Sequence, residues 1–312
     1  MEPPLPEIKE IPITRASISR LEISRHDKAK VKGGDIFSEP YCNVYLVARK
    51  KSGKTWVVGT ILNKCAGKNT TVYLFVSTHS KDAAWVEIKK KLAAKGIEVI
   101  AYDAIREGKV NHLDTIIKEL NEQHEDEDED AQEKKIASRS AGGVPSIFSS
   151  VINAQPPIAS SQVIAAPVQR AAAAGDSEEE EAVAKGHKPS KITPEVMFVF
   201  DDISSELKNP VLISLLKKNR HYKSKIIISS QDLKDLSPAS RFNIDYWILF
   251  PGLTEERLKT IYSNADVSVD ELTFSRMYGM ATAKKFNFLF VDRPNDQFRH
   301  NFNKLLVPVR GR

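Results

Sequence analysis

The strongest chemical signal in the sequence is the octet Ala48-Arg49-Lys50-Lys51-Ser52-Gly53-Lys54-Thr55. It resembles the phosphate-binding loop signature G-x-x-x-x-G-K-[ST], with alanine in the first position. In such a loop, backbone N–H groups surround phosphate oxygens at a helix N-terminus, whose dipole favours anions. Gly53 permits the turn, Lys54 is expected to reach the β- and γ-phosphates, and the Thr55 hydroxyl is expected to ligate Mg²⁺. The sequence therefore predicts a nucleotide site formed by this octet and the following Trp56.

A second motif places two carboxylates at the end of an apolar run. Residues 197–200 are Met, Phe, Val and Phe, and Asp201 and Asp202 follow them, which resembles a Walker B strand. Because the C-terminal ends of parallel strands face the ligand crevice, we expect both aspartates to lie near Lys54. Asp201 is predicted to hold Mg²⁺, through water, and Asp202 to orient or deprotonate the attacking water. The structural alternative is an Asp-Asp pair that caps a helix after the strand.

A third apolar run, residues 225–229, ends in Ser230 and Gln231. The Gln231 amide is predicted to hydrogen-bond the γ-phosphate or the attacking water; a polar residue that merely caps the next turn is the alternative. Arg220 and Arg241 are candidates to cross a subunit boundary and stabilise charge in the transition state, and we prefer Arg220. For either arginine, an ordinary surface or DNA-backbone role remains open.

The elements that must position these residues alternate between strands and helices. Short apolar runs predict strands at residues 41–48, 70–77, 97–102, 195–202, 225–231, 243–250 and 286–292. Amphipathic segments predict helices at 54–65, 82–95, 112–123, 210–218, 254–262, 272–283 and 298–306. This alternation predicts an α/β protein with a mostly parallel central sheet flanked by helices, which together with the loop indicates a P-loop NTPase fold.

The chain divides into four segments by composition. Residues 1–38 are proline-rich and charged, and are predicted to form an N-terminal arm with one strand at 16–23. Residues 39–121 hold the first part of the predicted ATPase domain, and residues 193–312 hold the second part, which includes the C-terminal strand and helix. Residues 122–192 are acidic and of low complexity, and are predicted to be a disordered insertion within one domain. A linker between two independent domains is the alternative.

Charge and composition limit the partners and the compartment. The chain carries 46 Lys+Arg against 41 Asp+Glu, a net charge of +5. Residues 122–192 contain 13 acidic and 7 basic residues, so the rest of the chain carries a net charge of about +11. This excess of positive charge is expected of a protein that binds a polyanion; the alternative is a lysine-rich surface that is simply solvated. Cys42 and Cys65 are too few for a disulfide framework, and no apolar run could span a bilayer. We expect a soluble, intracellular protein.

Several segments together resemble the genome-packaging ATPases of large DNA viruses, the poxvirus-type branch of the FtsK–HerA superfamily, which also occurs in virophages and virus-like transposons. The segments are ARKKSGKT, FVFDD, NRHYKSKIIISSQ, SRFNIDYWILF and FLFVD. The resemblance covers residues 39–121 and 193–312. Many NTPases share the first two motifs; the more specific features are Arg-His-Tyr before the strand that ends in Ser-Gln, and Arg241-Phe-Asn shortly afterwards.

The resemblance implies a RecA-like sheet with an added strand between the P-loop strand and the Walker B strand. It further implies ATP and Mg²⁺ as cofactors, and a homo-oligomeric ring that threads double-stranded DNA into a preformed capsid with capsid or portal proteins as partners. The location would be a viral factory, the host nucleus or cytoplasm, or the virion. Two other functions remain open: a nucleotide or nucleoside kinase, and a structural subunit that binds nucleotide without turnover. DNA-contacting candidates are Lys89, Lys90, Lys91, Lys217, Lys218 and Lys223.

Overall fold

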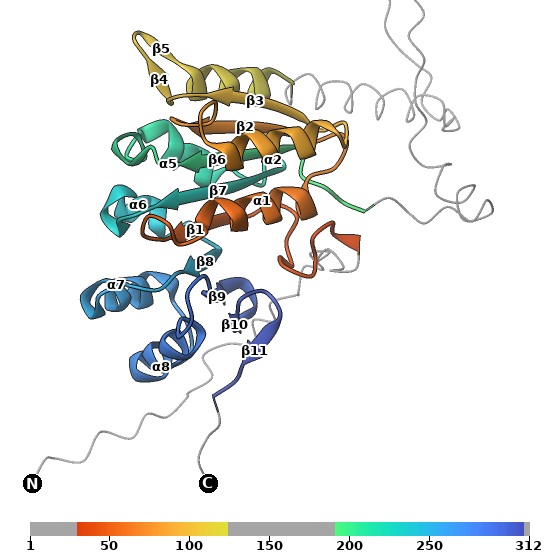
Figure 1. Cartoon of the computed structure of the whole chain (residues 1–312). Coiled ribbons are helices and arrows are strands. Elements are labelled where there is room, and N and C mark those ends of the chain that lie inside the picture. Colours follow the sequence, from red (N-terminus) through yellow and green to blue (C-terminus); the bar gives the residue numbers. More distant parts are fainter. Residues whose placement is uncertain (1–29, 124–190, 309–312) are drawn as a thin grey trace, which may run out of the picture.

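A nine-stranded sheet lies at the centre of the protein (Figure 1), and the computed structural model describes residues 30–123 and 191–308. The strands of this sheet are β1 (Asn43–Val47), β2 (Thr71–Val76), β3 (Glu98–Tyr102), β6 (Val196–Asp201), β7 (Ser224–Ser230), β8 (Tyr246–Leu249), β9 (Leu289–Asp292), β10 (Gln297–His300) and β11 (Lys304–Leu306). The helices are α1 (Lys54–Cys65), α2 (Ala83–Ala93), a helix over 112–123, α5 (Pro210–Lys217), α6 (Pro238–Arg241), α7 (Glu255–Ala265) and α8 (Glu271–Ala281). Short 3₁₀ turns occupy Ser204–Glu206, Leu233–Asp235 and Arg293–Asn295.

The strand order is β11-β10-β9-β8-β1-β7-β6-β2-β3. Strands β8, β1, β7, β6, β2 and β3 are parallel to their neighbours in this series, and β9, β10 and β11 extend it as antiparallel strands. The α/β P-loop NTPase fold predicted from the sequence is confirmed. Strand β7 lies between the loop-bearing β1 and the acidic β6, which is the added strand that the resemblance implied.

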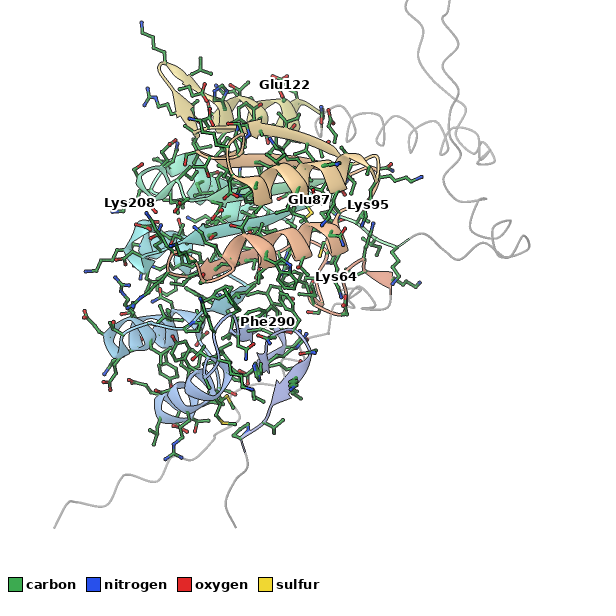
Figure 2. All side chains as sticks on the ribbon, viewed as in Figure 1. Lys64, Glu87, Lys95, Glu122, Lys208 and Phe290 are labelled. Atoms are coloured by element: carbon green, nitrogen blue, oxygen red, sulfur yellow. The ribbon has the colours of Figure 1, made fainter. Side chains whose placement is uncertain are left out.

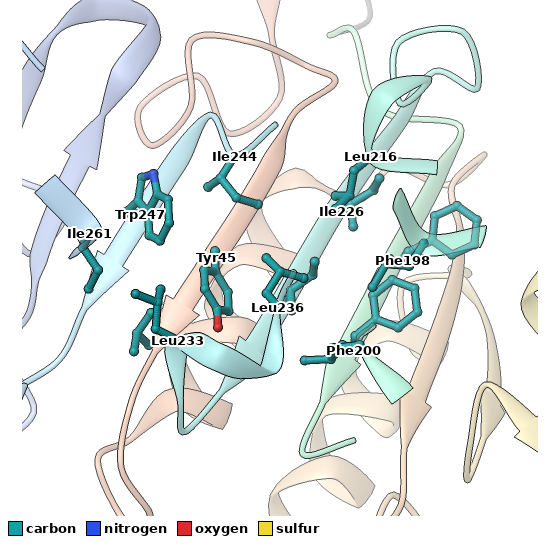
Figure 3. Close-up of a cluster of buried hydrophobic side chains, with 14 of the residues drawn as sticks. Tyr45, Phe198, Phe200, Leu216, Ile226, Leu233, Leu236, Ile244, Trp247 and Ile261 are labelled. Atoms are coloured by element: carbon teal, nitrogen blue, oxygen red, sulfur yellow. The ribbon is translucent and has the colours of Figure 1, made fainter. Parts of the chain in front are cut away.

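The central strands are apolar because both of their faces are covered. All residues of β1, β6 and β7 are buried. Side chains alternate between the faces: Tyr45, Phe198 and Ile226 pack on the side of α5, α7, α8 and the helix over 112–123 (Figure 3), whereas Leu46 and Val199 pack under α1 and α2. Side chains fill the space on both sides of the sheet (Figure 2), so the sheet is a rigid base for residues at its edges.

The predicted C-terminal helix over 298–306 is wrong. The segment forms the antiparallel strands β10 and β11, which turn at Asn301, where φ is +53°. Phe298 is buried against Phe274 of α8, while the neighbouring Arg299 reaches Asp292 from the other side, so the segment alternates with the period of a strand. Phe298, Phe302, Leu305 and Leu306 recur at i, i+4, i+7 and i+8, which is the spacing of a helix face, so the sequence pattern favoured a helix.

Other differences from the sequence-based predictions are local. Strand β9 begins at Leu289 rather than at Phe286, because residues 284–287 form a turn. A small hairpin of β4 (Arg106–Glu107) and β5 (Val110–Asn111) was not predicted. Residues 30–38, assigned to the arm, contribute Ile36 and Phe37 to the core. The strand expected at 16–23, and residues 124–190 of the predicted insertion, lie outside the described residues.

Within residues 30–123 and 191–308, no helix combines the length and the apolar character that crossing a membrane requires.

Candidate functional site

The loop between β1 and α1 has the backbone of an anion-binding turn. Gly53 stands at the N-cap of α1 with φ +91° and ψ +13°, and no side chain caps the helix. The first turn of α1 contains no acidic residue, so its free N–H groups and the helix dipole favour a bound anion. The second left-handed residue of the loop is Lys51, with φ +61°.

Alanine in the first position of the loop is compatible with this conformation. Ala48 is buried at the end of β1, donates its N–H to the Ser230 carbonyl at 3.0 Å and does not have a positive φ. The left-handed turns fall on Lys51 and Gly53 instead. Because glycine is required only where the backbone enters that region or another chain approaches closely, its replacement at position 48 leaves the turn intact.

Lys54 lies between the two aspartates of the acidic strand. Its Nζ is 3.0 Å from Oδ1 of Asp201, as an ion pair without aligned hydrogen-bond geometry, and 3.3 Å from Oδ1 of Asp202. Asp201 is buried, whereas the side chain of Asp202 is 40% exposed in a left-handed backbone conformation. The two motifs, separated by about 150 residues in the sequence, therefore form one polar cluster, as we expected.

Gln231 joins the same cluster through the sheet register. Val47 of β1 pairs with Ser230 of β7, and Asp201 of β6 pairs with Ser229, so the three strands end at one edge. The Gln231 amide donates to Asp202 Oδ1 at 2.8 Å. Both Lys54 and Gln231 reach this one oxygen, and among the described residues no protein donor reaches Oδ2.

Electrostatics keep Asp202 ionised. Its partial burial would raise the pKa, but the hydrogen bond from Gln231 and the charge of Lys54 outweigh burial and lower the pKa of the carboxyl below its ordinary value. A carboxylate with a lowered pKa is a poor proton acceptor at neutral pH. The environment of Asp202 is thus better suited to orienting water than to removing its proton.

Trp85 is a site residue that the sequence did not reveal. It is buried in the first turn of α2, and its indole N–H donates to Asp201 Oδ2 at 3.3 Å. Asp201 is therefore held from two sides, by Lys54 at one oxygen and by Trp85 at the other. The one signal that could have indicated Trp85 is the order of the strands. Helix α2 follows β2, and β2 pairs directly with β6, so the first turn of α2 begins near the end of β6 where Asp201 lies.

The cluster fits a magnesium-bound triphosphate. Among the described residues, no group of three or more His, Cys, Asp or Glu could cage a metal by itself. Mg²⁺ is usually held by one or two carboxylates together with substrate phosphates, and this site offers Asp201, Asp202 and the hydroxyl of Thr55 beside a phosphate-binding loop. The buried Ser52 hydroxyl in the same loop has no partner among the described residues, as expected for a group that would contact a ligand.

Of the predicted arginines, two lie beside the phosphate-binding loop and one lies far from it. Arg49 and Arg241 line one cavity beside the loop, together with Asp232 and Arg257, which form an ion pair at 2.7 Å. Arg220 is exposed and precedes β7, at the opposite edge of the sheet, roughly 20 Å away by the length of that strand. Within one chain it cannot reach Lys54.

Trp56 and the candidate DNA-binding lysines lie on the surface. Trp56 is exposed and lines a cleft between α1 and α2 that also includes Ile88. Lys89, Lys90 and Lys91 belong to α2, whereas Lys217, Lys218 and Lys223 cluster where α5 ends and β7 begins. The six lysines therefore form two separate groups on the structure and not one continuous basic surface.

Two curated viral proteins are similar to part of this chain. Uncharacterized protein 075L of Invertebrate iridescent virus 6 is 28% identical over 102 residues, which are 32% of this chain and 40% of that protein. Uncharacterized protein L437 of Acanthamoeba polyphaga mimivirus is 29% identical over 97 residues, which are 30% and 34% of the two chains. The chain thus spans less than half the length of these relatives. No protein-family model matches it.

Solved structures similar to this chain include two of viral origin. The genome packaging NTPase B204 from Sulfolobus turreted icosahedral virus 2, in complex with AMP, covers 87% of this chain and all of its own, with a TM-score of 0.45 and 15% identity. B204, the DNA-packaging ATPase from Sulfolobus Turreted Icosahedral Virus, covers 87% and 99%, with a TM-score of 0.46 and 15% identity. Likenesses at these values do not establish a shared activity, so function is argued from the site.

Proposed function

We propose that this chain is an ATP-hydrolysing motor that translocates double-stranded viral DNA into a preformed capsid. The observation that carries the nucleotide-hydrolysing part is the cluster at the sheet edge, where Lys54 of the loop lies within 3.3 Å of both Asp201 and Asp202. The DNA-packaging part rests on the resemblance of residues 39–121 and 193–312 to packaging ATPases of the FtsK–HerA superfamily.

The residues would divide the work as follows. The N–H groups at the start of α1 and the Lys54 ammonium bind the phosphates, and Thr55 and Asp201 hold Mg²⁺, which supplies charge neutralisation on the phosphates. Asp202 orients the attacking water through Oδ2, and Gln231 fixes the carboxylate by donating to Oδ1. Since Lys54 pairs with both carboxylates, its movement toward phosphate would free Oδ1 of Asp201, whereas Oδ1 of Asp202 would keep the hydrogen bond from Gln231.

The active form in this proposal is a homo-oligomeric ring with DNA and capsid or portal proteins as partners. Arg220 is too far from its own chain's Lys54, so it can act as the charge-stabilising arginine only from a neighbouring subunit. Arg241 lines a cavity with Arg49 of the loop and is the alternative for that role.

A phosphate-release assay with and without duplex DNA tests the proposal. DNA-stimulated release supports a motor. Transfer of phosphate to a small acceptor would instead identify a kinase, and nucleotide binding with no release in either condition would identify a structural subunit. The variant Lys54→Ala is the control for release that does not come from this site.

A further inference from the structure

An exposed aromatic side chain lies beside the phosphate-binding loop. A Cβ added to Gly53 would stand 3.2 Å from Cδ1 of Phe286, so the ring of Phe286 directly flanks the glycine of the loop. The sheet explains this position. Leu289 of β9 pairs with Leu249 at the C-terminal end of β8, and β8 neighbours β1, so the turn before β9 meets the loop after β1.

Burial in the core does not explain the conformation of Phe286. The residue is 56% exposed, so it adds little to the core, yet its φ is +69°. A bulky residue rarely adopts the left-handed region, where glycine or asparagine would be less strained. Strained backbone of this kind is often found at functional sites, so the exposed ring is a candidate for contact with a ligand.

The turn that presents this ring is firmly held. Asn301 donates from its side chain to Asn287 at 3.2 Å and accepts the Phe288 N–H at 3.0 Å. The adjoining Phe288 is buried against Phe250. Lys285 holds its ammonium 4.9 Å from the centre of the Phe286 ring in a cation–π contact, so a positive charge accompanies the exposed ring beside the loop.

We propose that Phe286 stacks on the base of the nucleoside triphosphate whose phosphates bind the loop of residues 48–55. This inference rests on the proposed nucleotide site and extends it to the base. Stacking uses the π-face that every base has, so the contact would strengthen nucleotide binding without selecting one purine by hydrogen bonds. Lys285 would then lie close to the same ligand, beside the ring.

The experiment compares a ligand that has a base with one that lacks it. Dissociation constants for Mg·ATP and for Mg·tripolyphosphate are measured by calorimetry on the wild-type chain and on Phe286→Ala. Stacking is worth about 1–3 kcal/mol per base, so Phe286→Ala should weaken ATP binding about 5- to 150-fold. Tripolyphosphate has no base to stack on the ring, so Phe286→Ala should weaken its binding much less than that of ATP.

Two further variants separate stacking from folding. Phe286→Asn suits a left-handed backbone and should raise the unfolding midpoint or leave it unchanged, yet it should weaken ATP binding as Phe286→Ala does. Phe242→Ala removes an equally exposed phenylalanine at the opposite edge of the sheet, near Arg293, and should change neither affinity.

Equal weakening of ATP and tripolyphosphate binding by Phe286→Ala, or no weakening of ATP binding, would overturn the base contact. The nucleotide site itself is tested separately by Lys54→Ala, which should weaken both ligands. If Lys54→Ala changes neither, the proposed function fails and the base contact fails with it; if Lys54→Ala weakens both while Phe286→Ala weakens neither, only the base contact fails.

Discussion

Replacing Trp85 with phenylalanine tests whether the indole fixes Asp201 for magnesium. The indole N–H donates to Asp201 Oδ2 at 3.3 Å, and both groups are buried. A hydrogen bond to a charged group contributes about 1.5–3 kcal/mol, and this one is longer than usual, so we expect the lower end, about 1.5 kcal/mol, to be lost with the donor. Removing a residue that orients a metal ligand typically costs 10–100-fold in metal affinity.

Trp247→Phe is the matched control. Trp247 is fully buried in β8, and its indole N–H has no hydrogen-bond partner among the described residues. Both substitutions remove the same atoms from the core, but only Trp85→Phe breaks a hydrogen bond. Urea unfolding should therefore show Trp85→Phe to be the less stable variant by about 1.5 kcal/mol or more.

The assay that bears on function is the Mg²⁺ dependence of phosphate release at saturating ATP. Trp85→Phe should raise the Mg²⁺ concentration needed for half-maximal release about 10-fold or more. Trp247→Phe should leave it unchanged. Equal stability of the two variants, together with unchanged Mg²⁺ dependence, would refute the idea that Trp85 positions Asp201.

Three other predictions follow from the described residues. Lys54→Ala should abolish nucleotide binding or turnover, while Asp202→Asn should leave binding largely intact and remove hydrolysis, as phosphate release and calorimetry would show; normal hydrolysis by Asp202→Asn would exclude its role. Burial raises the pKa of the Cys42 thiol to about 12, so the folded state keeps a proton that the unfolded state loses above pH 9. The contribution of Cys42 to the free energy of unfolding should fall by about 1.4 kcal/mol per pH unit between pH 9 and 12. In urea unfolding, the free energy of unfolding of Cys42→Ala should therefore decrease less steeply with pH over this range than that of the wild-type chain. Phe298→Ala should destabilise the protein by about 3–5 kcal/mol, since Phe298 is a buried strand residue; a loss below 1 kcal/mol in urea would contradict its packing on α8.

The sequence predicted those parts of the site that local patterns encode. The loop, the paired aspartates and Gln231 each follow an apolar run that is buried on both faces. The run identifies the strand, and the polar residues after it mark the strand's C-terminal end. Their meeting point followed from one rule, that parallel strands end at a common edge. The distances of 3.0 Å and 3.3 Å from Lys54 to the aspartates agree with that expectation.

Other features depend on contacts between distant elements and could not be predicted. Trp85 reaches Asp201 only because α2 packs beside the strand pair β2–β6, and nothing within residues 82–95 marks this tryptophan as different from a core residue. The strands β10 and β11 are short, and β11 is largely exposed, so their sequences carry little strand periodicity. Their conformation is decided by pairing with β9 and by the contact of Phe298 with Phe274.

The antiparallel strands also have a consequence for the site. Because β9 runs opposite to β8, the segment that enters β9 arrives at the same edge where β1 leaves the sheet. A helix followed by a parallel strand would have entered at the other edge, far from Gly53. The reversal of direction at β9 is therefore what brings Phe286 to the loop, and a nucleotide bound there would contact both the parallel part of the sheet and its antiparallel extension.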